Sequence, residues 1–138
     1  MASAAIVDQN KLLVLRRSSG EKFLSGYWTI VGGKYEESDA SIEDAVKREV
    51  LEETGLLVTI VRPIDVEEFT REDRPNMKAV EVTYLCVPEK GGEIKLNPDE
   101  HDSSLWLDER TAATLNPMSD LTKRKIEKIF GSIRENNI

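Results

Sequence analysis

The sequence predicts an α+β fold, an α/β/α sandwich in which a mixed β-sheet is packed between helices. Segments with the composition of strands and segments with the periodicity of helices alternate irregularly, which favours a mixed sheet over a strict βαβ series. The two clearest helical segments each carry one apolar face, as expected of helices that cover a sheet. With 138 residues, the chain is long enough to bury one core and short for two ordinary domains. We therefore expect a single domain that spans residues 1–138.

The N-terminal quarter of the chain predicts three strands. Residues 3–7 and 12–17 are rich in strand formers, and the turn formers at residues 8–10 between them predict a hairpin. After a polar loop, residues 27–31 are a third predicted strand. Two glycines follow at residues 32–33, where a backbone without side chains can turn sharply or approach a ligand closely.

A helix is predicted over residues 42–54, and both of its ends carry recognisable signals. Ser41 is an N-cap residue with Asp44 three positions later. Gly55 stands where a left-handed C-cap belongs, and Leu56 is available for the hydrophobic contact that accompanies such a cap.

Two long strands are predicted next, over residues 58–69 and 79–87, on either side of a polar turn at residues 71–76. An acidic loop at residues 89–102 leads to a short strand at residues 105–107.

Two helices should close the chain. A short helix begins near residues 108–109, and Ser119 with Asp120 caps the last helix. The inner face of the last helix is expected to carry Leu121, Ile126, Ile129, Phe130 and Ile133.

The composition excludes several classes of partner. The net charge of −7 and the isoelectric point near 4.9 argue against a long nucleic acid, whose phosphates bind clustered Lys and Arg. The single cysteine, Cys86, excludes an internal disulfide and is expected to be a small apolar residue in a strand. No apolar run approaches the length of a membrane span and no signal-peptide pattern opens the chain, so we expect a soluble cytoplasmic protein. Composition leaves open whether the chain forms a homodimer.

Three glutamates crowd one region of the predicted helix, namely Glu49, Glu52 and Glu53. At about 100° per residue, Glu49 and Glu53 fall in the middle of the arc that carries the apolar residues. Such a cluster survives by protonation, by pairing with basic side chains or by binding a cation. Arg48 can pair with Glu52 at the i, i+4 spacing, which leaves two carboxylates uncompensated. An all-oxygen cluster favours a hard ion, Mg²⁺ or Mn²⁺.

The alternative is a solvated acidic face, which is the common explanation of a charge run. A solvated face would lie opposite the apolar residues of the helix, whereas Glu49 and Glu53 lie among them. Leu51, on the far side of the helix, predicts that the helix is covered from two directions.

The nine residues from Arg48 to Leu56, Arg-Glu-Val-Leu-Glu-Glu-Thr-Gly-Leu, resemble the second half of the signature of the Nudix (MutT-like) hydrolase family. The first half departs from the family pattern. Five residues after Gly33 the chain has Asp39 in place of a glutamate, and eight residues instead of seven then precede Arg48. The position of that glutamate is therefore taken by a shifted Asp39 or by Ala40.

The resemblance implies a Nudix fold and Mg²⁺-dependent hydrolysis of the diphosphate linkage in a nucleoside diphosphate derivative. Carried over by position, the implied ion-binding groups are Glu49, Glu52, Glu53, the backbone carbonyl of Gly32 and Glu100 of the acidic loop. Asp102 is the second choice for the loop ligand. Arg48 would hold the carboxylates in place, and Glu49 would also orient the attacking water.

Cationic residues near the predicted site are candidates for binding substrate phosphates, namely Arg16, Arg17 and Lys34. Their alternative is exposure at a strand edge. Arg71 and Arg74 are expected to be solvated in the polar turn.

Other residues with chemical potential have simpler expected roles. Trp28 and Trp106 are expected to be packing residues. His101 could be a ligand or a general acid, but its position between two acidic residues favours a surface histidine. The sequence contains no convincing Ser/His or Cys/His nucleophile motif, in agreement with direct attack by water.

The first hypothesis for function is a Mg²⁺-dependent pyrophosphohydrolase that acts on a nucleoside triphosphate, including a damaged one. Cleavage of ADP-ribose or of a sugar nucleotide stays open, because the loops that select a substrate cannot be placed from one sequence. A non-catalytic sensor that binds a nucleotide is the alternative from another class, and the complete acidic cluster argues against it. An RNA-end processing role lacks the basic stripe that a long RNA would need.

Overall fold

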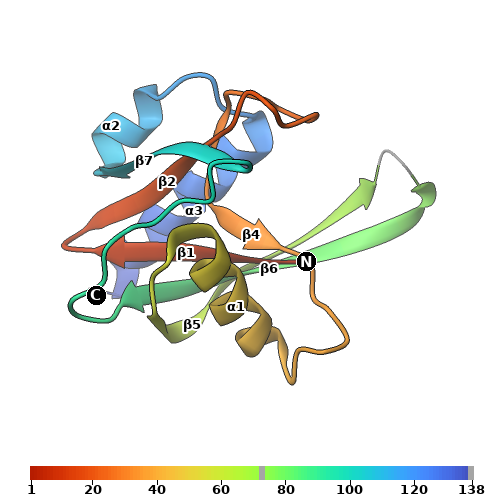
Figure 1. Cartoon of the computed structure of the whole chain (residues 1–138), viewed down its shortest axis with the longest axis horizontal. Coiled ribbons are helices and arrows are strands. Elements are labelled where there is room, and N and C mark those ends of the chain that lie inside the picture. Colours follow the sequence, from red (N-terminus) through yellow and green to blue (C-terminus); the bar gives the residue numbers. More distant parts are fainter. Residues whose placement is uncertain (72–73, 137–138) are drawn as a thin grey trace.

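The computed structural model of the chain describes residues 1–71 and 74–136. In chain order, its elements are β1 (Ala2–Asp8), β2 (Lys11–Arg17), β3 (Trp28–Thr29), β4 (Val31–Gly33), α1 (Ile42–Thr54), β5 (Val58–Arg71), β6 (Arg74–Pro88), β7 (His101–Leu107), α2 (Glu109–Thr114) and α3 (Asp120–Asn136). The strands form one mixed sheet, with α1 on one face and α2 and α3 on the other (Figure 1). This arrangement confirms the predicted fold class. In the described part of the chain, no helix has the length and apolar character needed to span a membrane.

Strand β1 lies at the centre of the sheet. It pairs antiparallel with β2 and β4 and parallel with β6. Its side chains alternate, so that Ala5 and Val7 pack in the core under α3 while Ala4 and Ile6 pack in the core under α1. Because both faces of β1 are covered, its sequence is almost continuously apolar.

Residues 27–31, predicted as one strand, belong to two strands. β3 pairs with β2, whereas β4 pairs with β1. The prediction was wrong because the chain passes from one partner strand to the other at the buried residue Ile30. In the new register Gly32 lies opposite Ser3 and Gly33 opposite Ala2, where β4 contacts α1.

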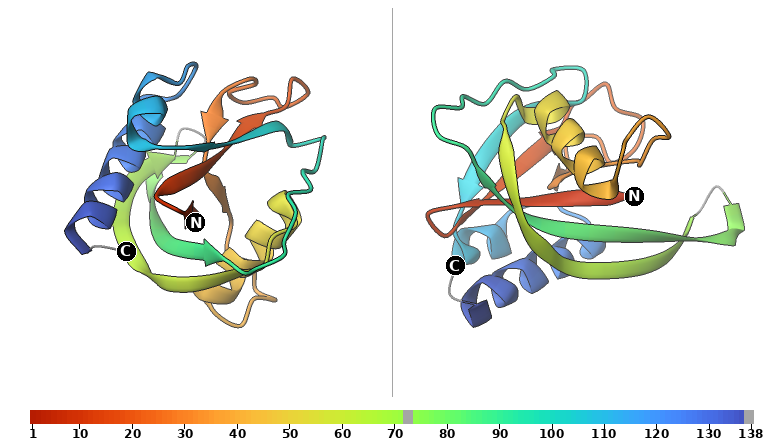
Figure 2. Two further views of the ribbon diagram at one scale, coloured as in Figure 1. Left: turned by 90° about the vertical axis from the view of Figure 1, so that its left-hand side faces the viewer. Right: turned by 90° about the horizontal axis from the view of Figure 1, so that it is seen from below.

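The β5–β6 hairpin is longer than predicted and extends past the body of the molecule (Figure 2). Residues 74–76 of the predicted turn belong to β6, with Arg74 exposed as expected. Residues 72–73 and the side chain of Arg71 lie outside the described part of the chain. Cys86 is buried in β6, as predicted.

Strand β7 begins at His101 rather than at residue 105. Its first residues, His-Asp-Ser-Ser, have little intrinsic tendency to form a strand. They do so because they pair with β2, where Arg17 lies opposite His101 and Leu15 opposite Ser104. Tertiary pairing has therefore overridden the local preference.

Helix α1 has the predicted bounds and caps. The Ser41 hydroxyl accepts a hydrogen bond of 3.1 Å from the Asp44 amide, and Gly55 has φ of 74°. Leu51 is 49% exposed, so the prediction that this helix is covered from two directions was wrong. The helix packs on the sheet with one side only, since Ala45, Val46 and Val50 form its buried apolar stripe.

The C-terminal half confirms the remaining packing predictions. The Ser119 hydroxyl accepts a hydrogen bond of 3.2 Å from the Thr122 amide, as an N-cap residue does. Trp28 is buried, and Trp106 is half-buried against the core under α1. The buried residues of the last helix include Ile126, Ile129, Phe130 and Ile133, while Leu121 is half-buried.

Replacing Gly55 should destabilise the fold through the backbone. An alanine at its positive φ costs about 1–2 kcal/mol, and its Cβ would lie 3.2 Å from Cβ of Lys95. We expect Gly55→Ala to lower the midpoint of urea unfolding. Gly20→Ala is the matched control, because a Cβ at Gly20 meets nothing within 4 Å; equal midpoints for the two variants would contradict the role of the cap.

Candidate metal and phosphate site

The C-terminal half of α1, strand β4 and the start of β7 converge on one acidic cavity of about 230 Å³. Its lining residues are Arg17, Glu21, Gly32, Gly33, Glu49, Glu53, Glu100 and His101. Four of them, Glu49, Glu53, Glu100 and Gly32, are predicted ion-binding residues. The sheet register places β4 and β7 here, and the caps of α1 fix which residues of the helix face them.

Three side chains of this cavity have the spacing of a cation site. Ligand atoms of Glu53, Glu100 and His101 all lie within 4.8 Å of one another. The distance from Nε2 of His101 to Oε1 of Glu53 is 3.8 Å. Oε2 of Glu53 and Nδ1 of His101 are buried and have no hydrogen-bond partner among the described residues. Buried polar atoms are normally satisfied, so these atoms fit a group that the chain itself does not provide.

The electrostatics of the cavity indicate what that group is. Burial and the neighbouring Glu49 carboxylate raise the pKa of Glu53 to about 9. Burial also raises the pKa of Glu49, against the opposing effect of Arg48, and it lowers the pKa of His101. Near neutral pH the ion-free cavity therefore holds a proton on Glu53 and a neutral imidazole. A divalent cation can replace that proton, because it favours the charged form of the carboxylates.

Gly33 leaves room for the Glu49 side chain where β4 meets α1. A Cβ at Gly33 would lie 2.2 Å from Cδ of Glu49, which is far inside van der Waals contact. The glutamate side chain thus occupies the space that any other residue would need. This close approach keeps the Glu49 carboxylate beside Glu53 and only 16% exposed.

Arg48 holds the other side of the acidic cluster. Its Nε and Nη2 donate to the two carboxylate oxygens of Asp39 at 2.8 and 3.0 Å. Its Nη1 donates to Glu49 at 3.1 Å and to Glu52 at 3.2 Å. The prediction that Arg48 would leave Glu49 uncompensated was therefore wrong, because one guanidinium reaches both carboxylates. The guanidinium hydrogen bond holds the pKa of Asp39 below its usual range. Of the two residues that could take the place of the family's loop glutamate, Asp39 is therefore the one that bonds Arg48. Ala40 is exposed.

Other predicted site residues lie at the rim or away from the cavity. The Glu52 side chain is 58% exposed and pairs with Arg48. Lys34 is exposed, and its backbone carbonyl accepts a hydrogen bond from Arg48. Arg16 pairs with Asp102 at 2.7 Å and lies over the ring of Trp28. Neither Asp102 nor these cations are among the residues that line the cavity.

Arg17 is the cation that the structure brings into the cavity. Its Nε donates to the Phe23 carbonyl at 2.8 Å, and its Nη2 donates to Glu21 at 3.1 Å. These contacts hold the guanidinium in a fixed orientation at the cavity wall.

The expectation that His101 is a surface histidine was wrong, because this residue is only 3% exposed. It begins β7, and the pairing of this residue with Arg17 turns its side chain inward toward Glu53. The neighbouring charges in the sequence suggested solvent. Only the pairing of β7 with β2, which links residues far apart in the chain, could have indicated burial.

A second cavity of about 260 Å³ adjoins the acidic cavity. It shares Arg17, Gly32, Glu53 and His101 with the acidic cavity. It then continues between the sheet and α3, along aromatic residues such as Tyr27 and Trp28 and along polar residues of β6 and α3. The two cavities together offer a charged end and a larger, partly apolar end.

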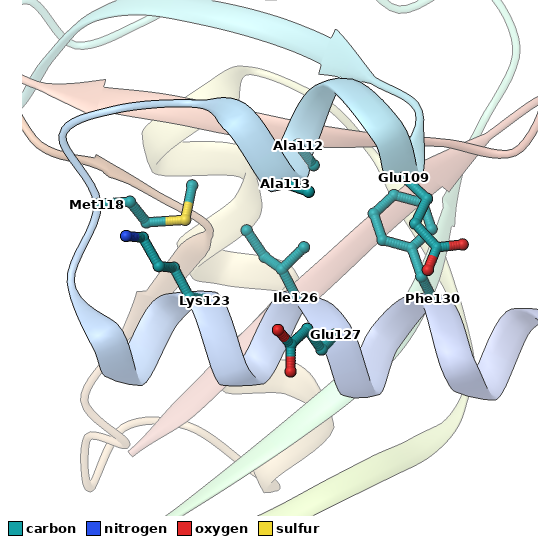
Figure 3. A pocket seen from close by; sticks show the side chains of 8 residues that line it. All are labelled: Glu109, Ala112, Ala113, Met118, Lys123, Ile126, Glu127 and Phe130. Atoms are coloured by element: carbon teal, nitrogen blue, oxygen red, sulfur yellow. The ribbon is translucent and has the colours of Figure 1, made fainter.

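A separate hollow lies between α2 and α3 (Figure 3). Its floor contains Ala112, Met118, Ile126 and Phe130, and charged side chains lie along its edge. It shares no lining residue with the acidic cavity, so it contributes nothing to the site described above.

The chain is similar to known proteins over most of its length. A family model described as NUDIX domain matches residues 1–128. The NAD-capped RNA hydrolase NudC of Vibrio atlanticus (strain LGP32) is 25% identical over 134 residues, which are 97% of this chain and 46% of that protein. The chain thus spans about half the length of this curated relative.

Solved structures with the same fold include three relatives of comparable size. The MutT NUDIX hydrolase of Burkholderia pseudomallei is 24% identical with a TM-score of 0.71, and the match covers 93% of this chain and 95% of that one. The MutT protein of Methanosarcina mazei Go1 is 24% identical with a TM-score of 0.74, covering 99% and 94%. An ADP-ribose pyrophosphatase of Streptococcus suis 89-1591 is 26% identical with a TM-score of 0.71, covering 96% and 90%. The matched residues 1–128 include the acidic helix α1 and all strands of the sheet. This match shows that the chain belongs to the NUDIX hydrolase family.

Proposed function

We propose that this chain is a pyrophosphohydrolase that depends on Mg²⁺ or Mn²⁺ and cleaves the diphosphate linkage of a nucleoside diphosphate derivative. Nucleoside triphosphates are the first substrate class that we propose. The observation that carries the proposal is the convergence of Glu53, Glu100 and His101 beside Glu49, with buried acceptor atoms left without a partner. A neighbouring cavity of about 260 Å³, which Tyr27 and Trp28 help to line, supports it.

The ion would be held by carboxylates of α1 and by the carboxylate of Glu100, which directly precedes β7. Ligand atoms of Glu53 and Glu100 lie within 4.8 Å of one another, Glu49 adjoins Glu53, and Gly32 would offer its backbone carbonyl. Glu52, bonded to Arg48 at the rim, would enter the ion shell from the solvent side. When bound, the ion supplies Lewis-acid stabilisation of the charge on the phosphoryl oxygens.

The side chains of the cavity have separate tasks in this proposal. Glu49 takes the proton of the attacking water, since its half-buried carboxylate and raised pKa suit a general base. Arg48 and the close backbone of Gly33 keep that carboxylate in position. Arg17 stabilises the non-bridging oxygens as charge moves to the leaving phosphate. Water adds to one phosphorus as the bond from that phosphorus to the bridging oxygen breaks, so no covalent enzyme intermediate forms.

ADP-ribose is the second candidate substrate. The ADP-ribose pyrophosphatase of Streptococcus suis is similar to this chain over 96% of its length. ADP-ribose and nucleoside triphosphates share the nucleoside diphosphate that the two cavities would hold. A turnover screen with both classes, with sugar nucleotides and with NAD-type dinucleotides therefore tests the substrate assignment. Absence of turnover of every compound in the presence of Mg²⁺ and Mn²⁺ would overturn the proposed activity.

Substitution of the proposed base should slow turnover strongly without disturbing the fold. Because a positioned general base contributes about 10²- to 10⁴-fold to rate, we expect Glu49→Gln to lower kcat by that factor. Glu43→Gln is the control, since Glu43 is exposed in the first turn of the same helix. Steady-state kinetics on the best substrate, with circular dichroism of both variants, measures the effect. Unchanged kcat in Glu49→Gln would exclude this residue as the base.

The stability of the ion-free protein should depend on the proton held by Glu53. The pKa of Glu53 is about 9 in the folded protein and about 4.3 in an unfolded chain, so unfolding between these values releases a proton. The contribution of Glu53 to the free energy of unfolding should therefore be largest below about pH 4 to 5. This contribution should fall as the pH rises toward 9. Glu53→Gln keeps a neutral side chain and should remove this dependence.

Urea unfolding of wild type and Glu53→Gln from pH 5 to 9, in the presence of a chelator, measures this difference. We expect the variant to be the more stable protein at pH 8 without divalent ions. Addition of Mg²⁺ should stabilise wild type more than the variant, because ion binding replaces the proton. Parallel pH profiles for the two proteins would show that Glu53 is not protonated in the folded state.

A further inference from the structure

A buried ion pair lies in the wall of the second cavity, and neither of its residues takes part in the proposed hydrolysis. Nζ of Lys125 is 2.6 Å from Oε1 of Glu81, and the two side chains are 7% and 13% exposed. Burial of such a pair is often no more stabilising than apolar packing in the same place. Fold stability alone therefore gives little reason for charged groups at this position, and both residues line the cavity.

The fold aims both side chains into the same space. Along β6, Leu85, Thr83 and Glu81 alternate with residues of the opposite face, and Leu85 packs in the core under α3. Glu81 therefore points toward α3, where Lys125 lies one turn after Leu121. The pair thus joins a strand and a helix across the cavity, at residues 44 positions apart.

The same cavity offers apolar surfaces for a flat ring. Tyr27, Trp28 and Leu121 line it, and Phe23 lines it while remaining 63% exposed. Aromatic faces of this kind stack on nucleobases. Arg17 and Glu53 also line this cavity, so a base near Lys125 and a phosphate near the acids can belong to one ligand.

The donor and acceptor pattern of the pair selects among bases. Glu81 provides a carboxylate, which accepts two adjacent N–H groups, and Lys125 provides an ammonium, which only donates. Among the described residues, Lys125 is the side-chain donor to Glu81, and it bonds Oε1. The ammonium keeps further N–H groups for an outside acceptor.

Guanine presents the complementary edge. Its N1–H and its 2-amino group are adjacent donors for a carboxylate, and its O6 beside them accepts from an ammonium. Adenine and cytosine each have one amino donor on this edge, without a second adjacent donor. Uracil has carbonyl oxygens on both sides of its N3–H, so one of them would face the carboxylate. An oxidised guanine with an intact Watson–Crick edge would be bound in the same way.

We propose that Glu81 and Lys125 bind the Watson–Crick edge of a guanine-type purine and so determine the base specificity of this chain. The proposal rests on the proposed function for the placement of the phosphates, and it adds the class of the nucleoside. Glu81 accepts from N1–H and the 2-amino group, Lys125 donates to O6, and the aromatic residues contact the ring faces.

Binding of nucleoside monophosphates tests this assignment without any need for turnover. Isothermal titration in Mg²⁺ buffer compares GMP, IMP, AMP and UMP on the wild-type protein. Because a bidentate contact discriminates bases by about 5- to 150-fold, we expect GMP to bind at least about 10-fold more tightly than AMP and UMP. IMP, which lacks the 2-amino group, should bind more weakly than GMP. Equal affinity for GMP and AMP, or for GMP and IMP, would overturn the proposal.

A matched pair of double variants assigns the preference to these residues. E81Q/K125Q removes both charges together, so that neither is left buried alone, and should reduce the preference for GMP over AMP to less than about twofold. The control is E68Q/K78Q, which removes an exposed pair of 3.0 Å on the same hairpin, and it should keep the wild-type preference. A preference that survives in E81Q/K125Q would overturn the role of the pair. Should E81Q/K125Q not fold, the comparison of GMP with IMP on wild type decides.

Hydrolysis assays separate this proposal from the proposed function. A guanine preference in binding without hydrolysis of any diphosphate substrate would uphold the base assignment and overturn the enzyme. Hydrolysis with equal kcat/KM for GTP and ATP would uphold the enzyme and overturn the base assignment.

Discussion

The site depends on one constraint, the close approach of α1 to the backbone of β4 with two carboxylates between them. The approach is possible because Gly33 has no side chain where the Glu49 carboxylate lies. It leaves Glu53 behind Glu49, shielded from water and next to another acid. Two like charges in such a place repel each other and lack solvation, so the fold can keep them only with a proton or a cation. The need of the site for a proton or a cation therefore follows from how closely α1 packs on β4.

The rest of the fold maintains this approach from both directions. On the sheet side, β1 holds β4 in register through Ser3 opposite Gly32, and β1 itself is fixed by burial on both faces. On the helix side, the Ser41 and Gly55 caps determine where α1 begins and ends, and so which residues face the sheet. Arg48 adds a third restraint, because Asp39 and Glu52 bind it from opposite ends of one guanidinium. Loosening any of the three would move the carboxylates relative to β4.

What the sequence could predict was local. The helix with its caps, the acidic cluster and the pairing of Arg48 with Glu52 depend on residues within one or two turns, and all of these geometric predictions agree with the structure. The split of residues 27–31 between β3 and β4, the early start of β7 and the burial of His101 depend on strands that are distant in the chain. His101 was mistaken for a surface residue because its neighbours Glu100 and Asp102 are charged, whereas its side chain is directed by pairing with β2.

The contrast between local and long-range contacts also explains why the sequence alone does not predict the pairing of Glu81 with Lys125. Each is one charged residue among many on an amphipathic element, and only the packing of α3 on β6 brings them together. The two proposals thereby assign separate tasks to adjoining spaces. The acidic cavity combines carboxylates of α1 with residues that β4 and β7 bring from distant parts of the chain. The second cavity is lined by residues of β6, of α3 and of the loop before β3. Gly32, Arg17, Glu53 and His101 border both spaces. Under the two proposals, a change of residues along β6 or α3 would alter which nucleoside is held and would leave the carboxylates of α1 in place. In these proposals, substrate choice depends on residues of β6 and α3, whereas bond cleavage depends on the close contact of α1 with β4.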